Sequence, residues 1–179
     1  MKRWMRRNGV ALITLAVLAP VGVFVLSGVE LLDRAGRVTE PVTAAGPDEP
    51  AESDGLSARV VDSAEFVGEG DGEGGNGIPI GLALVATLTE ISADRDVSCT
   101  PDLTTGSGEA RRTWPSLSAP ERFGYGYGDD TAIACSLDAG ETIELETVFL
   151  TPVGTYPDSV LELTVTSEGA RSVLRLPLR

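Results

Sequence analysis

Carboxylates are the only side chains with catalytic chemistry that this sequence supplies in number, with 27 Asp and Glu among 179 residues. The chain has no histidine, and its single lysine is Lys2. These absences exclude Ser-His-Asp and Cys-His nucleophiles, a Schiff-base lysine, a histidine-ligated zinc site and a phosphate-binding P-loop. Paired carboxylates, as in glycoside hydrolysis, remain as a catalytic alternative. Abundance alone assigns no catalytic residue, and the sequence indicates no cofactor.

The two cysteines, Cys99 and Cys135, predict one disulfide if the domain is exported, because their number is even. They are too far apart in sequence to form a C-x-x-C redox pair. In the chain-entropy model, closing a loop of this length stabilises the folded state by about 3–4 kcal/mol.

The segment GEGDGEGGNG, residues 68–77, is both acidic and rich in glycine. Asp71, Glu73 and Asn76 could supply oxygen ligands to Ca²⁺, since glycines allow backbone carbonyls to turn inward. The segment matches neither the EF-hand loop nor the glycine-rich calcium repeat. We therefore favour a flexible acidic loop between two strands, with a calcium site as the alternative.

Aromatic residues gather in RFGYGYGDD, residues 122–130. Phe123, Tyr125 and Tyr127 would lie on one side of an extended chain, where they could stack on a ligand or contact a protein. The plainer interpretation is a loop laid across the sheet that packs its own rings. If the domain has a contact surface, we expect it here.

Two adjacent arginines and a tryptophan occur together in ARRTW, residues 110–114. Arg111 and Arg112 could pair with carboxylates of a partner or with acidic residues of the domain itself, and an arginine could stack on Trp114. Pairing within the domain is favoured because the domain is so acidic.

Eight segments after residue 55 alternate apolar and polar residues with the period of two that is typical of strands. No sustained 3.6-residue pattern occurs in this part of the chain. We predict an all-β protein, an antiparallel immunoglobulin-like β-sandwich of about seven or eight strands. The segments are residues 56–67, 78–92, 96–100, 110–114, 131–137, 141–150, 159–167 and 171–179.

The same alternation predicts which side chains share a face. Within residues 78–92, one face of the strand is the more apolar. It carries Ile80, Leu82, Leu84, Ala86 and Leu88. In the later segments, Glu144, Glu146 and Glu162 are expected to point outward. The inward residues are Ile143, Leu145, Thr147, Phe149, Leu161, Leu163, Val165, Leu174, Leu176 and Leu178.

Residues 10–29 form an uncharged apolar run. About 20 residues at 1.5 Å each cover a hydrocarbon core of roughly 30 Å. Signal peptides usually have shorter apolar regions that end in an A-x-A site, which is missing here. We predict a retained transmembrane helix in the lipid bilayer, with a cleaved signal as the alternative. Basic residues 1–9 precede the run and acidic residues follow it, which predicts a single-pass protein of the cell membrane with a cytoplasmic N-terminus.

Residues 30–55 are rich in Pro, Ala, Glu and Gly, and predict a flexible stalk that carries an extracellular domain over residues 56–179. Everything beyond the predicted helix contains ten arginines against 27 acidic residues, a net charge of −17. Such a charge repels nucleic acid, which we exclude as a partner.

CSLDAGETIELETVFLTP, LELTV and LRLPL resemble the C-terminal half of small telokin-like, immunoglobulin-type bacterial domains of unknown function. In that pattern a turn, here Ala139-Gly140, leads into a strand ending in F-x-x-P, here Phe149 to Pro152. The resemblance extends over roughly residues 56–179 and implies an interaction or accessory module without catalytic residues. Such domains are often carried on lipoproteins and single-pass membrane proteins.

The leading hypothesis is therefore a membrane-anchored, extracytoplasmic module for protein binding or scaffolding in a bacterial cell envelope, with no enzymatic activity. Its expected partner is another envelope or membrane protein. The preference for Arg over Lys, with abundant Ala, Gly and Val, suggests a high-GC Gram-positive bacterium. The alternatives are an envelope glycan hydrolase that uses carboxylates, and a calcium-stabilised adhesion module.

Overall fold

The computed structural model describes residues 41–44, 46–70, 75–167 and 170–179. The predicted cytoplasmic segment, the predicted transmembrane helix at 10–29 and residues 30–40 of the predicted stalk lie outside this part of the chain. Among the described residues, no helix is long and apolar enough to span a membrane.

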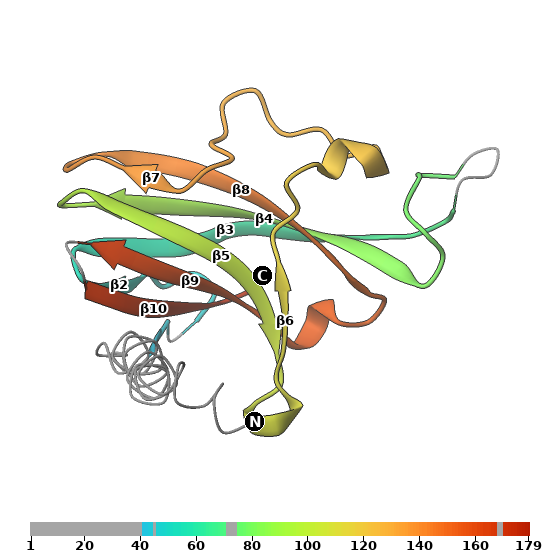
Figure 1. Ribbon diagram of the computed structural model, residues 1–179, viewed down its shortest axis with the longest axis horizontal. Coiled ribbons are helices and arrows are strands. Elements are labelled where there is room, and N and C mark those ends of the chain that lie inside the picture. Colours follow the sequence, from blue (N-terminus) through green and yellow to red (C-terminus); the bar gives the residue numbers. More distant parts are fainter. Residues whose placement is uncertain (1–40, 45, 71–74, 168–169) are drawn as a thin grey trace, which may run out of the picture. The chain divides into compact units, whose positions relative to one another are not determined.

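Two sheets face each other in the described part, which confirms the predicted all-β sandwich (Figure 1). The first sheet has the order β1-β10-β9-β5-β6, with β7 paired to β5, and the second has the order β2-β3-β4-β8. Apart from the parallel pair β1 and β10, neighbouring strands are antiparallel. The first sheet comprises β1 (Val42–Thr43), β5 (Val97–Thr105), β6 (Arg112–Pro115), β7 (Ser136–Leu137), β9 (Ser159–Ser167) and β10 (Ala170–Pro177), and the second comprises β2 (Ala51–Ser53), β3 (Leu56–Val67), β4 (Leu82–Ala93) and β8 (Thr142–Pro152).

The sandwich begins earlier than the sequence predicts. Strands β1 and β2 fall within residues 30–55, which we had assigned to the stalk, and Ala44 and Ala51 are buried in the core. Both strands are too short to show an alternating pattern, and pairing with β10 and β3 determines their conformation. The stalk boundary at residue 55 is therefore wrong, since Val42–Thr43 and Ala51–Ser53 already belong to the sheets.

The main core lies between the two sheets and follows the predicted alternation in most strands. The inward positions of β8, β9 and β10 are occupied as expected, and burying each large apolar side chain contributes about 1.5–3 kcal/mol. The fully buried examples are Leu145, Phe149, Leu161, Leu163, Val165, Leu174 and Leu176.

Strand β4 differs, because its more apolar face points away from this core. Leu84 and Ala86 lie on the outer face of the second sheet in a separate cluster with Ile78 and Val148, and Ile80 is 81% exposed. Both faces of β4 are covered, so the alternation alone could not show which of them the first sheet contacts.

The inner face of β4 instead carries two buried threonines. The Thr87 and Thr147 hydroxyls form a hydrogen bond of 2.7 Å between β4 and β8, which are paired at these residues. The Thr89 and Thr151 hydroxyls are buried, and neither has a hydrogen-bond partner. A buried hydroxyl without a partner costs free energy that an apolar side chain of the same shape would not.

The predicted disulfide between Cys99 and Cys135 is confirmed, with the two Cα atoms 5.1 Å apart. The backbone N–H of Cys99 also donates to the Cys135 carbonyl at 3.0 Å. This link attaches the end of a long connection, residues 116–134, to β5 of the first sheet. We call this connection the strap; Figure 1 shows it in gold, between β6 and β7.

We predict opposite stability effects for two neighbouring threonine substitutions. Thr89→Val should raise the free energy of unfolding by about 1 kcal/mol because it removes an unpartnered hydroxyl, whereas Thr87→Val should lower it by about 1–2 kcal/mol because it leaves Thr147 unpaired. Urea denaturation of the full chain, kept in solution with a nonionic detergent, measures both. Adding Thr147→Val to Thr87→Val should restore most of the loss, and equal effects of the two single variants would contradict this account.

Candidate functional site

The strap lies along the edge of β8 and covers part of the outer face of the second sheet. Leu117 donates its backbone N–H to the Val148 carbonyl at 2.7 Å. Ala132 bridges to Leu145, with backbone hydrogen bonds of 2.8 Å to Glu144 and Glu146. These bonds satisfy an edge that would otherwise be open to pairing with another chain.

The three rings of the strap pack on the sheet. Phe123, Tyr125 and Tyr127 contact the outer cluster of Ile78, Leu84, Ala86 and Val148, and each ring remains partly exposed. The short 3₁₀ helix Pro120–Phe123 ends at Gly124, whose φ of 72° favours glycine and turns the chain back over the sheet. The rings pack within the domain as the plainer interpretation predicted, and their contact with a partner stays a prediction.

Glu146 of β8 fastens the strap through its carboxylate. The Tyr125 hydroxyl donates to Oε1 at 2.5 Å, while the Thr131 hydroxyl and the Gly128 backbone N–H donate to Oε2 at 2.6 Å and 2.8 Å. Three donors from the strap thus converge on one side chain of the sheet. Hydrogen bonds to an ionised carboxylate are about twice as strong as those between neutral groups.

These contacts change the acidity of the groups involved. Burial raises the pKa of Glu146, but the hydrogen bonds from Thr131, Tyr125 and Gly128 lower it more, so the net pKa lies below the usual value. Burial, the hydrogen bond to Glu146 and its negative charge raise the pKa of Tyr125. Burial, with the nearby Glu121 and Glu146 carboxylates, raises the pKa of Tyr127. At neutral pH Glu146 is therefore a carboxylate anion beside the neutral phenols of Tyr125 and Tyr127.

Next to Glu146 is a cavity of about 260 Å³ on the outer face of the second sheet. Its lining includes Ala64 and Ala86, which are paired on β3 and β4, and the rings of Phe66 and Tyr125. These rings meet edge to face at 5.8 Å, and Tyr125 meets Tyr127 in the same way at 5.9 Å. Asp62, Thr131 and Glu146 give the cavity its polar side chains. Ser63 and Thr87 also line it, but their hydroxyls bond Tyr156 and Thr147 instead.

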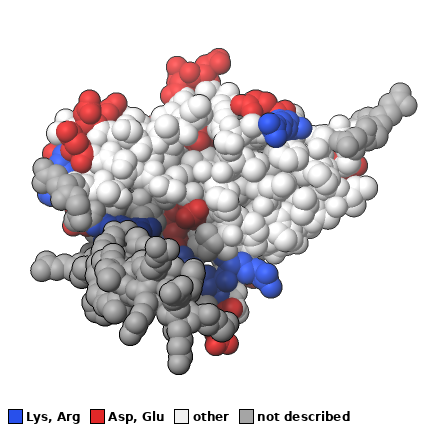
Figure 2. Space-filling view, in the orientation of Figure 1, with Lys and Arg blue, Asp and Glu red and all other residues white. Residues whose placement is uncertain are grey.

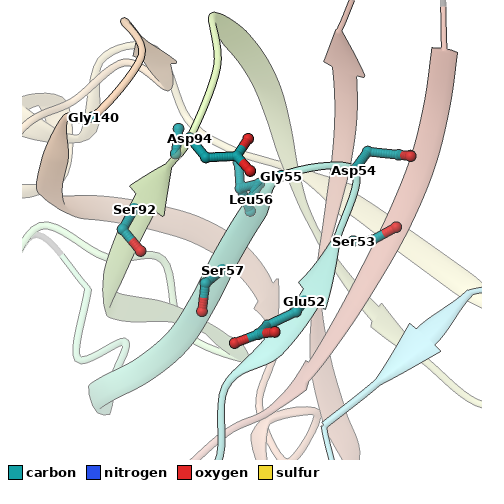
Figure 3. Close-up of a pocket in the computed structure, with 10 residues that line it drawn as sticks. Glu52, Ser53, Asp54, Gly55, Leu56, Ser57, Ser92, Asp94 and Gly140 are labelled. Carbon is teal, nitrogen blue, oxygen red and sulfur yellow. The ribbon is translucent and has the colours of Figure 1, made fainter.

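A larger cavity, of about 620 Å³, lies at the turn between β2 and β3 (Figure 3). Its acidic residues include Glu52 and Asp54, whose side chains point in different directions in Figure 3, and Asp94, which pairs with Arg95 at 3.1 Å. No aromatic side chain lines it. Because its polar groups do not converge, we take the smaller cavity beside the strap as the candidate site.

The predicted arginine and tryptophan residues lie elsewhere. Arg111 pairs with Glu162 of β9, which also accepts from Arg175 at 2.9 Å, as expected for pairing within the domain. Glu162 points outward as predicted, yet it is only 6% exposed. Arg112 is exposed, and Trp114 packs partly against the main core. Arg112 and Trp114 belong to β6 of the first sheet and Arg111 directly precedes it, so none of the three joins the rings of the strap.

A second acidic group adjoins this ion pair. Asp102 is the cross-strand neighbour of Glu162. Burial and the negative charge of Glu162 raise the pKa of Asp102, and Arg111 opposes them. A glycan hydrolase places its two carboxyls on either side of a bound sugar, whereas these two lie side by side on adjacent strands of one sheet.

Of the calcium candidates, Asp71 and Glu73 lie outside the described residues. The Asn76 side chain accepts from the backbone N–H groups of Glu69 and Ile78 at 3.0 Å and 3.3 Å and donates to the Val67 carbonyl at 2.8 Å. It therefore holds the base of the β3–β4 loop. Within the described ranges, no group of three or more acidic or cysteine side chains is arranged to bind a metal ion.

Phe66, Asp62 and Glu146 were not among the predicted site residues. A β-bulge between Val60 and Asp62 shifts the register of β3, so that Asp62, Ala64 and Phe66 share the outer face with Leu88, Ala86 and Leu84 of β4. The one indication of this site in the sequence was the prediction that Glu146 points outward. Its convergence with Tyr125 depends on the path of the strap.

Comparison with known proteins gives fold likenesses only. No family model matches the chain, and no curated protein matches it. An uncharacterized β-sandwich protein from Clostridium difficile 630 aligns with a TM-score of 0.39 and 13% identity, over 78% of this chain and 96% of that one. The yjhA protein from Bacillus subtilis aligns with a TM-score of 0.47 and 10% identity, over 73% and 98%.

A conserved hypothetical protein from Bacillus anthracis aligns with a TM-score of 0.44 and 13% identity, over 72% of this chain and 93% of that chain. At these scores the likenesses carry no further argument. The architecture described above comes from the strand pairing of this chain itself.

We predict that Glu146→Gln makes the free energy of unfolding less dependent on pH in the acid range. Because the folded pKa of Glu146 is lowered, its stabilising contribution is fully present above the ordinary value of about 4.3 and is lost as the pH falls through the folded value. Between pH 6 and 3 the full chain should therefore lose more unfolding free energy than the variant, measured by urea denaturation at each pH. Glu144→Gln controls for net charge, and an equal reduction of the pH dependence by that variant would show that Glu146 has no special role.

Proposed function

We propose that this protein is a single-pass, membrane-anchored module of the telokin-like, immunoglobulin type, which binds or scaffolds another protein outside the cytoplasmic membrane of a bacterium. The apolar run at residues 10–29 and the basic residues before it support the anchor and its orientation. The disulfide supports an oxidising compartment, where such bonds persist.

One observation supports protein binding more than any other. Four large apolar side chains are exposed at one end of the second sheet: Phe66 at 43%, Val67 at 47%, Ile80 at 81% and Val153 at 46%. Val67 ends β3 and pairs with Ala83, while the Val153 N–H bonds to the Gly81 carbonyl at 3.1 Å, next to Ile80. Grouped exposed apolar side chains are typical of protein-interaction surfaces.

The charge distribution is consistent with such a surface. On the face shown in Figure 2, acidic side chains form small separate groups on a mostly uncharged surface. A partner can therefore bury apolar area without covering a continuous field of like charge.

A binding role without catalysis is favoured over glycan hydrolysis by the state of the Glu146 carboxylate at the candidate site. A glycosidase needs a general acid that stays protonated near neutral pH, opposite a second carboxylate. At the candidate site, the pKa of Glu146 is shifted downward, in the direction that keeps it ionised. We therefore propose a module that positions other envelope components.

Site-specific photocrosslinking tests the binding surface. A photoreactive amino acid at Ile80, in the full chain produced in its native bacterium, should give a discrete crosslinked species that also forms from Val153. The same amino acid at Arg112, on the edge of the first sheet, is the control. Crosslinks that are equally frequent at all three positions, or absent from all, would remove the proposed surface.

Membrane association is tested in the same cells. The full chain should sediment with membranes and resist extraction at alkaline pH, and its cysteines should react with an alkylating reagent only after reduction. A variant lacking residues 10–29 should lose the membrane association. A mature protein that begins after residue 28 would support a cleaved signal instead of an anchor.

A further inference from the structure

Glu146 differs from the other carboxylate that organises a sheet face. Glu162, on the outer face of the first sheet, is neutralised by Arg111 and Arg175. For Glu146, the described part of the chain supplies hydrogen bonds from Tyr125, Thr131 and Gly128 and no arginine within salt-bridge distance. These donors stabilise the anion without cancelling its charge. Within the described ranges, the second sheet thus presents a partly buried negative charge that no cation neutralises.

Asp62 adds a second negative charge to the same cavity. The register places Asp62, Leu88 and Glu146 in one row across β3, β4 and β8, so that both carboxylates lie on the same face. Asp62 is exposed, and one of its oxygens accepts from the Ser63 N–H at 2.9 Å. No arginine among the described residues pairs with it.

The cavity also has an aromatic wall. Phe66 and Tyr125 line it, and in the next row of the sheet the small side chains of Ala64 and Ala86 leave an apolar floor. An ammonium or guanidinium group is attracted both to the face of an aromatic ring and to a carboxylate, and its methylene stem packs well on apolar surface. A neutral apolar group would gain nothing from the carboxylates, and an anion would be repelled.

The size of the cavity limits the ligand. At about 260 Å³ it is smaller than the roughly 300–1,000 Å³ of pockets for drug-sized molecules. One long side chain is a better match than a cofactor or a sugar chain. A bare metal ion is also a poor match, because the oxygens of Glu146 already accept three hydrogen bonds and Asp62 is the one other carboxylate among the described residues that line the cavity.

We infer that this cavity binds the charged end of a lysine or arginine side chain from the partner protein. The inference rests on the proposed function and defines the partner by its chemistry: a basic residue for the cavity, flanked by apolar residues for Val67, Ile80 and Val153. The cation would complete the charge balance that Arg111 and Arg175 supply at Glu162 and that no arginine among the described residues supplies at Glu146.

Small cations that mimic the two side chains test the cavity directly. The full chain, ¹⁵N-labelled and kept in solution with a nonionic detergent, is titrated with n-butylammonium, n-butylguanidinium and, as the neutral control, n-butanol. We expect saturable shifts of the backbone amide signals of Ala64, Gly128 and Thr131 with the cations, with dissociation constants on the order of millimolar, and no saturation with butanol. Raising the salt concentration should weaken the cation binding.

Substitutions separate charge from shape. Glu146→Gln should weaken cation binding by about tenfold, whereas Glu144→Gln, with the same charge change two residues away on β8, should leave it unchanged. Ala64→Leu should abolish binding by filling the floor while both carboxylates remain. This variant keeps the test decisive even if Glu146→Gln loosens the strap.

The results distinguish this inference from the proposed function. Equal binding of butanol and butylammonium, or equal loss in the Glu144 and Glu146 variants, would overturn the cationic pocket. If the cations fail to bind while the crosslink at Ile80 still forms, the pocket is wrong and the protein-binding function stands. If the cations bind as expected and no crosslink forms, the pocket stands and the proposed function is wrong.

Discussion

A single carboxylate on the outer face of the second sheet determines where the strap lies. Glu146 gathers a phenol, a hydroxyl and a backbone N–H from Tyr125, Thr131 and Gly128, which are close together in sequence but irregular in conformation. The Cys99–Cys135 disulfide attaches the end of the same segment to the first sheet. Held at both places, a glycine-rich connection becomes an ordered cover for one face of the sandwich.

This cover explains the composition of β4. A strand of a two-sheet sandwich usually has one wet face, but β4 is covered by the first sheet on one side and by the strap and its rings on the other. Its leucines and Ala86 lie beneath or beside the strap. Its threonines face the main core, where Thr87 finds a partner in Thr147 and Thr89 finds none. The core therefore contains polar groups whose free-energy cost the larger apolar side chains of both sheets offset.

The same arrangement creates the candidate site. The strap leaves Phe66 and the small side chains of β3 partly uncovered, so the cavity forms between the sheet and the edge of the strap. The carboxylate that fastens the strap is also the charge presented to the cavity. Structural and binding roles thus meet in Glu146, and they can be separated experimentally because Ala64 and Asp62 line the cavity without making any of the strap's contacts to Glu146.

Much of the fold could be predicted from local patterns. The alternation in β8, β9 and β10 predicts both the strands and their buried faces, since each of these strands contributes one clearly apolar side to the main core. The disulfide followed from an even count of cysteines. The anchor at residues 10–29 and the type of sandwich stay predictions.

What the sequence by itself determined was the all-β class, the chemistry that a chain without histidine cannot perform, and the aromatic character of residues 122–130. Tertiary structure decided which face of β4 contacts the first sheet and that β1 and β2 belong to the sandwich. It also decided that Tyr125, Phe66 and Glu146 lie together. These features depend on a bulge in β3, on pairing between distant segments and on the path of an irregular loop. The local alternation of residues cannot predict these features, because each arises from contacts between residues far apart in the chain.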